Sequence, residues 1–105
     1  MAKRPFYSQN FLDGMGNPEG GVAFGEGFCV SWQRGPLGRG ESRREPNGAF
    51  VETLLAVVRE RLMFYQGSRF ECQANAEAIG YINDALRVLH DRTREARQVE
   101  GLNQA

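Results

Sequence analysis

The stretch that decides the fold is YQGSRFECQANAEAIGYINDALRVLHDRTREARQVEG, residues 65–101, which predicts a turn followed by one long helix. On a helix, side chains three and four positions apart lie on the same face. That spacing joins one polar residue and a run of mostly apolar ones into a single stripe: Asn75, Ile79, Ile82, Leu86, Leu89 and Thr93. Because Asn75 is polar, we expect its amide to have a hydrogen-bonding partner where the stripe is covered.

Arg92 flanks the other end of this stripe, about 25 Å from Asn75 at the helical rise of ~1.5 Å per residue. One small ligand cannot bridge that span within a single copy of the chain. Two copies that pack antiparallel would bring Asn75 of one copy near Arg92 of the other. The pattern therefore predicts a binding site that is shared between the subunits of a homo-oligomer.

The residues before this stretch predict a second helix that packs against the first. It covers residues 47–66, with Asn47 as its N-cap and Glu52 near its positive end. Residues 66–69 form the turn, and the long helix covers residues 71–97. The two helices make an αα-hairpin, whose apolar faces pack together or against another copy.

Alternating apolar and polar residues upstream predict a small β-hairpin in residues 22–45. Residues 25–34 alternate as a strand, residues 35–38 form a turn, and residues 39–44 return. Residues 1–21 are glycine-rich and are expected to form a flexible arm without regular structure. We therefore expect an α+β fold over residues 22–105: a small N-terminal antiparallel sheet followed by a two-helix C-terminal hairpin.

Composition narrows the class of function. A chain of 105 residues forms one domain at most, and its formal net charge of zero argues against binding a DNA or RNA polymer. No window is apolar enough to span a membrane, and the N-terminus lacks the apolar core of a signal peptide. Cys29 and Cys72 lie in separate elements, and we expect both to be small buried thiols of a reducing cytoplasm.

Catalytic and metal-binding patterns are missing from the sequence. His90 is the single histidine, and its neighbour Asp91 points in a different direction on a helix. No histidine or cysteine pair has the spacing of metal ligands. The glycine-rich residues 35–40 lack the lysine and hydroxyl of a P-loop, so they are better interpreted as a turn. We expect no catalytic residue, no metal and no cofactor.

The sequence contains more residues suited to ligand binding than to catalysis. The aromatic residues Tyr65 and Phe70 bracket the turn, and a ring that faces outward there would stack on a base. Asn75 would contact a base edge or ribose, and Arg92 would contact phosphate. With Gln66 in the same turn, these residues form the predicted ligand site.

An arginine cluster upstream has two interpretations that the sequence leaves open. It is either a solvated face compensated by Glu41 and Glu45 or a second pocket for a polyanionic ligand. Its members are Arg34, Arg39, Arg43 and Arg44.

Four segments together resemble the phage Thoeris anti-defence one family. They are WQRGPLG (32–38), PNGAFVE (46–52), FECQANAEAI (70–79) and RTREARQVEG (92–101), and the resemblance covers residues 25–101. The helical hairpin is also similar to that of the anti-CBASS two family of phage proteins. Two departures stand out: Gln73-Ala74 where many relatives have an arginine and a glutamate, and Gln98 where glycine is common.

This resemblance implies a protein that binds without turnover. Members of the family are sponges, which hold cyclic nucleotide immune signals in the cytoplasm of the infected bacterium so that the downstream effector stays inactive. It implies dimers and a hexamer, with glycocyclic ADP-ribose isomers bound between two copies of a dimer by Tyr65, Asn75 and Arg92. It also implies cyclic trinucleotides at a separate junction, for which the arginine cluster is the candidate. The alternative is a small phage protein that inhibits a host protein by direct contact.

Overall fold

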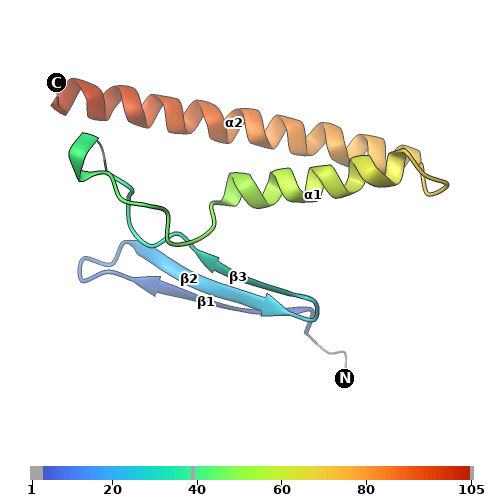
Figure 1. Ribbon diagram of the computed structural model, residues 1–105, viewed down its shortest axis with the longest axis horizontal. Coiled ribbons are helices and arrows are strands. Elements are labelled where there is room, and N and C mark those ends of the chain that lie inside the picture. The colour runs from blue at the N-terminus through green and yellow to red at the C-terminus, as the bar shows by residue number, and fades with distance from the viewer. Residues whose placement is uncertain (1–3, 39, 105) are drawn as a thin grey trace. The chain divides into compact units, whose positions relative to one another are not determined.

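A computed structural model describes residues 4–38 and 40–104, with side chains described as far as Arg92. Its elements are β1 (Phe6–Leu12), β2 (Pro18–Gly25), β3 (Phe28–Trp32), a 3₁₀ turn (Gly40–Ser42), α1 (Val51–Gln66) and α2 (Gln73–Gln104). A three-stranded antiparallel sheet is followed by two helices, which confirms the predicted α+β class (Figure 1). The chain forms two compact units, Met1–Val51 and Glu52–Ala105, which are described in turn.

The sheet is a meander in the order β1-β2-β3. The first turn is fixed by Asp13, whose side-chain Oδ1 accepts hydrogen bonds from the backbone N–H groups of Met15 and Asn17, each at 2.9 Å. Such an Asx turn supplies the backbone bonds that a tight reversal otherwise lacks. The second turn is closed by Gly27, whose φ of 88° is readily adopted by glycine.

This sheet corrects two predictions. Residues 1–21 were expected to lack regular structure, but β1 and the start of β2 lie within them because each strand supplies hydrogen bonds to the other. The predicted return strand over residues 39–44 is also wrong. Strand β3 pairs instead with β2, which precedes β3 in the chain. Residues 40–42, within the predicted return strand, form a 3₁₀ turn. Arg39 lies outside the described residues.

A short bridge ties the end of β3 to residues 47–49. Ala49 donates its N–H to the Ser31 carbonyl at 2.7 Å and accepts from the Gln33 N–H at 2.9 Å. Asn47 makes three further bonds here: its Oδ1 accepts from the Arg34 N–H, its Nδ2 donates to the Arg34 carbonyl, and its N–H donates to Gln33 Oε1. The prediction that Asn47 caps the first helix is therefore wrong, since its side chain serves the bridge and the helix begins at Val51.

Replacing Gly48 with alanine is expected to destabilise this bridge strongly. A Cβ at Gly48 would overlap the Trp32 carbonyl and lie 2.7 Å from the Gln33 nitrogen, both backbone atoms that would have to shift. We expect a loss of about 2 kcal/mol or more, in the range of overpacked positions. Gly80→Ala is the matched control, because a Cβ at Gly80 has nothing within 4 Å and alanine favours a helix.

Thermal unfolding of the two variants at equal protein concentration measures the difference. The midpoint should fall for Gly48→Ala and stay level or rise for Gly80→Ala. An unchanged midpoint for Gly48→Ala would show that the bridge is not needed.

The second unit is an αα-hairpin, in which α1 and α2 run antiparallel beside each other (Figure 1). Helix α1 starts four residues later than predicted, at Val51, and α2 extends past the predicted end at residue 97 to Gln104. Glu52 lies in the first turn of α1, as predicted, where a carboxylate stabilises the helix end. Polar links between the helices include a hydrogen bond from Arg59 Nη1 to Asn83 Oδ1 at 3.0 Å and an ion pair between Arg92 and Glu52.

The predicted stripe on α2 is half-buried in the single chain. Asn75, Ile79, Ile82, Leu86 and Leu89 are all partly covered, while Tyr81 and Val88 beside them are 73% and 56% exposed. Among the described residues no hydrophobic side chain is fully buried. A single chain thus leaves a large part of its apolar surface in contact with water, and covering such a surface is a strong driving force for association.

Candidate functional site

The tip of the helical hairpin is built by the turn between α1 and α2. The free carbonyls at the end of α1 are satisfied by the turn: the Tyr65 carbonyl accepts from the Ser68 N–H at 3.0 Å and from its hydroxyl Oγ at 2.6 Å. Ser68 Oγ in turn accepts from the Phe70 N–H at 3.1 Å. These bonds replace the partners that a helix lacks at its C-terminus, and they fix where Phe70 leaves the turn.

Aromatic rings gather at this tip. The rings of Tyr65 and Phe70 meet edge to face with centroids 6.4 Å apart, and Phe64 lies 6.3 Å from Tyr65. Phe64 and Phe70 are 65% and 58% exposed. Such exposure is unfavourable for phenylalanine in water, but it leaves ring faces accessible to the base of a ligand.

Two arginines lie over these rings. The Arg61 guanidinium lies 5.1 Å from the Tyr65 ring centroid and 5.3 Å from that of Phe64, and its Nε donates to the Tyr65 hydroxyl at 3.2 Å. Arg69 lies 4.9 Å from the Phe70 ring. The tip therefore combines aromatic faces with positive charge, which suits a base attached to phosphates.

Polar groups anchor the start of α2 to the end of α1. Gln66 Oε1 accepts from the Cys72 N–H at 3.0 Å, and Gln66 Nε2 donates to the Cys72 carbonyl at 3.1 Å. Asn75 Nδ2 donates to Gln66 Oε1 and to the Phe70 carbonyl, each at 3.2 Å. The expected partners of the Asn75 amide are thus Gln66 and the Phe70 carbonyl, both within the same chain.

The structure brings four of the five predicted ligand-site residues together at the tip: Tyr65, Gln66, Phe70 and Asn75. Arg92 is not among them. It lies toward the other end of the paired helices, where its Nη2 is 3.7 Å from Glu52 Oε1 and its side chain is 67% exposed. A single chain therefore does not complete the predicted set.

Sequence reasoning missed the contribution of Arg61 and Ser68. Arg61 precedes Tyr65 by four residues and Phe64 by three, a spacing that places it on the same helical face as both rings. Ser68 follows a glycine in the turn, where a hydroxyl commonly caps backbone groups. Both signals were present in the sequence, but neither distinguishes a site from an ordinary hairpin.

The arginines of the cluster on the sheet unit differ in their contacts. Arg34 Nε lies 3.9 Å from Glu19 Oε1, and the Arg34 backbone binds the Asn47 side chain. Arg43 and Arg44 have exposed side chains, and their N–H groups donate to the carbonyls of Gly40 and Leu37. This arrangement is compatible with either interpretation of the cluster.

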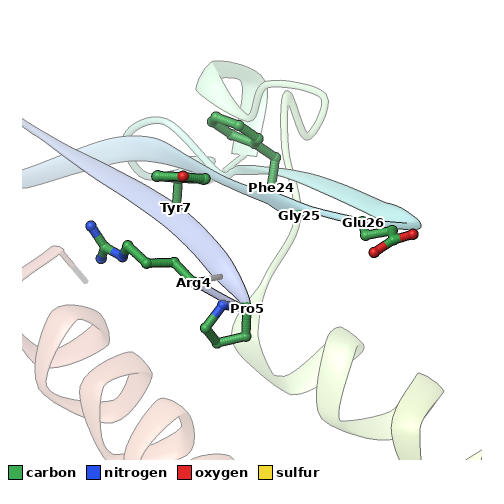
Figure 2. Close-up of a pocket in the computed structure, with 6 residues that line it drawn as sticks. All are labelled: Arg4, Pro5, Tyr7, Phe24, Gly25 and Glu26. Carbon is green, nitrogen blue, oxygen red and sulfur yellow. The ribbon is translucent and has the colours of Figure 1, made fainter. Parts of the chain in front are cut away.

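An open pocket of about 600 Å³ lies elsewhere on the sheet unit, between the start of β1 and the β2–β3 turn (Figure 2). Its floor includes Tyr7 and Phe24, which face each other across β1 and β2 with stacked rings 5.6 Å apart. Arg4 lies 5.2 Å from the Tyr7 ring. Pro5, Gly25 and Glu26 complete the lining. None of these residues belongs to the arginine cluster.

Cys29 and Cys72 are free thiols, but both are exposed, so the prediction that they are buried is wrong. No three histidine, cysteine or carboxylate side chains in the described part of the chain are grouped as metal ligands would be. No helix there is long and apolar enough to cross a membrane.

The chain is thus a small α+β protein in which a three-stranded antiparallel sheet is followed by a helical hairpin with exposed aromatic rings at its tip. The chain is similar to a Thoeris anti-defence protein of a phage. Over 77 residues it is 40% identical to Thoeris anti-defense 1 of Bacillus phage SBSphiJ7, a match that covers 71% of this chain and 51% of the relative. The chain thus spans about half the length of that relative. No family model matches the chain.

Proposed function

We propose that this protein acts in the host cytoplasm as a phage sponge for cyclic nucleotide immune signals. It binds glycocyclic ADP-ribose isomers, and cyclic oligonucleotides at a second pocket, without degrading them. Thoeris immunity, and CBASS immunity where such oligonucleotides are the signal, then remain inactive. The observation that carries this proposal is the exposed aromatic cluster beside the anchored Asn75 amide, in a chain 40% identical to a Thoeris anti-defence protein.

Each part of the proposed pocket has a chemical role. The base stacks on the aromatic faces of Tyr65 and Phe70, and burial of both surfaces from water favours this contact. Arg61 and Arg69 add positive charge close to the rings. Asn75 contributes a hydrogen bond, and Arg92 from a second copy contributes a charge-assisted bond to phosphate.

A second copy is part of the proposal because Arg92 lies about 25 Å along α2 from Asn75, at ~1.5 Å per residue. Two copies that pack antiparallel along α2 would place each Arg92 near the other copy's hairpin tip. Arg92 is able to accept this role because its own side chain is 67% exposed and its contact with Glu52 is long, at 3.7 Å, so that the pair contributes little. The proposed assembly is a dimer, with three dimers forming a hexamer.

The second pocket is proposed at the arginine cluster of the sheet unit. Arg43 and Arg44 are exposed, and guanidinium groups pair well with the phosphates of a cyclic oligonucleotide. Arg39, which lies outside the described residues, belongs to the same proposal. Arg34 would have to exchange its contact with Glu19 for the ligand.

We expect a bound signal to be recovered chemically unchanged. The test is to incubate the purified protein with a glycocyclic ADP-ribose isomer, remove free ligand, denature the protein by heat and analyse the supernatant by chromatography and mass spectrometry. Intact ligand in a fixed ratio to protein, independent of incubation time, supports sequestration. Linear product that accumulates with time and protein concentration would instead indicate an enzyme.

A pair of matched variants distinguishes ligand bound at the proposed site from ligand that the protein retains nonspecifically. Asn75→Ala should carry much less ligand through the washing step, whereas Gln73→Ala, an exposed change on the same turn of α2, should carry as much as the wild type. A wild-type protein that retains no cyclic nucleotide would favour the alternative function, inhibition of a host protein by direct contact.

A further inference from the structure

We infer that Gln66 fixes the orientation of the Asn75 amide, so that Asn75 offers the ligand a hydrogen-bond acceptor and selects a ligand group that donates. Gln66 is thereby a positioning residue and Asn75 determines specificity. This inference rests on the proposed function, because it concerns the same site.

The orientation of Gln66 is set by backbone groups whose roles are fixed. The Cys72 N–H is able only to donate, and it faces Gln66 Oε1 at 3.0 Å. The Cys72 carbonyl is able only to accept, and it faces Gln66 Nε2 at 3.1 Å. Rotating the Gln66 amide by half a turn would place two donors together and two acceptors together. The oxygen of Gln66 therefore stays on the side of the Cys72 N–H, where it also meets Asn75.

The orientation of Asn75 follows from that of Gln66. Its Nδ2 faces two acceptors, Gln66 Oε1 and the Phe70 carbonyl, each at 3.2 Å. A primary amide nitrogen carries two N–H groups, so these two bonds use both. Reversing the amide would direct its oxygen at two other oxygens, and each of those would lose its donor. The carbonyl oxygen Oδ1 is thus the atom of Asn75 that remains for a ligand.

An acceptor at this position restricts the ligand chemistry. Phosphate oxygens are acceptors and would be repelled by Oδ1, which places phosphate recognition on the arginines. An adenine nucleotide has two kinds of neutral donor: the exocyclic amine of adenine and the hydroxyls of ribose. Both present the same N–H or O–H chemistry to Asn75, next to rings on which a base is able to stack.

Three probes distinguish the two donors by titration calorimetry. They are glycocyclic ADP-ribose, its hypoxanthine counterpart in which a carbonyl replaces the adenine amine, and a deoxy analogue that lacks a free ribose hydroxyl. The wild type should bind one of the two analogues about 10- to 100-fold more weakly than the parent, as expected when a partly buried acceptor loses its donor. Loss with the hypoxanthine probe identifies the adenine amine, and loss with the deoxy probe identifies the ribose.

The role of Gln66 is measured by the ratio of the affinities for the parent ligand and for its analogues, and not by the affinity for one ligand alone. In Gln66→Ala the amide of Asn75 keeps one anchor, the Phe70 carbonyl, and is able to turn toward the ligand with either atom. Discrimination between parent and analogue should fall to within about threefold. Gln73→Ala, which replaces an exposed glutamine on the same turn of α2, should keep the wild-type ratio. A purely structural role for Gln66 would weaken all three probes equally and leave the ratio unchanged, which would overturn the inference.

A measurement without ligand separates this inference from the proposed function. In nuclear magnetic resonance spectra of the ligand-free protein, the Asn75 side-chain amide signals should shift in Gln66→Ala and stay in place in Gln73→Ala. Unshifted signals in Gln66→Ala would contradict the Gln66–Asn75 bond whatever the ligand. If the wild type binds both analogues as tightly as the parent while Asn75→Ala weakens all three, the sponge function stands and the acceptor role is wrong. If the wild type binds none of the probes, the proposed function fails and the selection of a donor fails with it.

Discussion

Mixing subunits that carry Asn75→Ala with subunits that carry Arg92→Ala is expected to restore tight binding of glycocyclic ADP-ribose. Each variant alone should bind more weakly by about 1–3 kcal/mol, the usual effect of losing a hydrogen bond to a charged or partly buried group. In a two-fold dimer of one copy of each variant, one pocket carries both changes and the other carries neither. Up to half the sites in such heterodimers should therefore bind as the wild type does.

The matched control uses the same two substitutions in a different distribution. When the double variant Asn75→Ala, Arg92→Ala is mixed with wild type, every pocket of a heterodimer carries one change if the pocket is shared. No intact pocket should then appear beyond those of the remaining wild-type dimers. Mass spectrometry of the intact complexes measures how many heterodimers form, and calorimetry measures the number of tight sites.

Arg92→Ala is a suitable variant for this experiment because the Arg92 side chain has little structural role in the single chain. Its pair with Glu52 is long, at 3.7 Å, and its side chain is 67% exposed. Arg92→Ala should therefore leave the hairpin folded, which circular dichroism checks. Confirmed heterodimers without any recovered tight sites would contradict a pocket built from two copies.

Charged substitutions on the apolar stripe of α2 are expected to abolish the proposed oligomer. Replacing Ile82 and Leu86 together with glutamate puts two carboxylates on a surface that one short partner helix leaves half-covered. Burying an unpaired charge is strongly unfavourable, so the assembly should fall to monomers or become insoluble. Light scattering gives the mass of the soluble fraction, and a wild-type mass would contradict the stripe as an interface.

Two further variants locate the interface on α2. Tyr81 and Val88 lie beside the stripe and are far more exposed than its members. Replacing both with glutamate should therefore disturb the hairpin less than the stripe variant does. If the interface extends to these two residues, the double variant should still dissociate the oligomer. Asp84→Lys changes charge at an exposed polar position of the same helix and serves as the control. Dissociation by Asp84→Lys as well would point to a general effect of charge and not to a particular face.

The helical hairpin could be predicted from the sequence because its signals are local. The three-and-four spacing from Asn75 to Leu89 and the glycine-containing turn after Gln66 each depend on residues close in the chain. The grouping of four candidate site residues at the tip could be predicted for the same reason, since Tyr65, Gln66, Phe70 and Asn75 lie within eleven consecutive positions of the sequence. The resemblance to the anti-defence family likewise depended on short runs of residues.

The sheet was predicted less well because its pairing depends on residues that are distant in the chain. The sequence before Gly21 is rich in glycine, which locally indicates irregular structure, yet β1 is stabilised there by the backbone of β2. Asn47 has the character of a helix cap, but the Arg34 backbone offers it both a donor and an acceptor. Tertiary contacts thus overrode two reasonable local preferences.

The sequence by itself determined the α+β class, the long helix with its polar start, and the grouping of Tyr65, Gln66, Phe70 and Asn75 at the hairpin tip. Only the tertiary structure decided the course of the sheet and the orientation of the amides. Local periodicity reports which face of an element is apolar, whereas an amide is symmetrical in shape and its polarity depends on what faces it. For Asn75 the facing groups are Gln66 and the Phe70 carbonyl, which folding brings together across the turn between two helices.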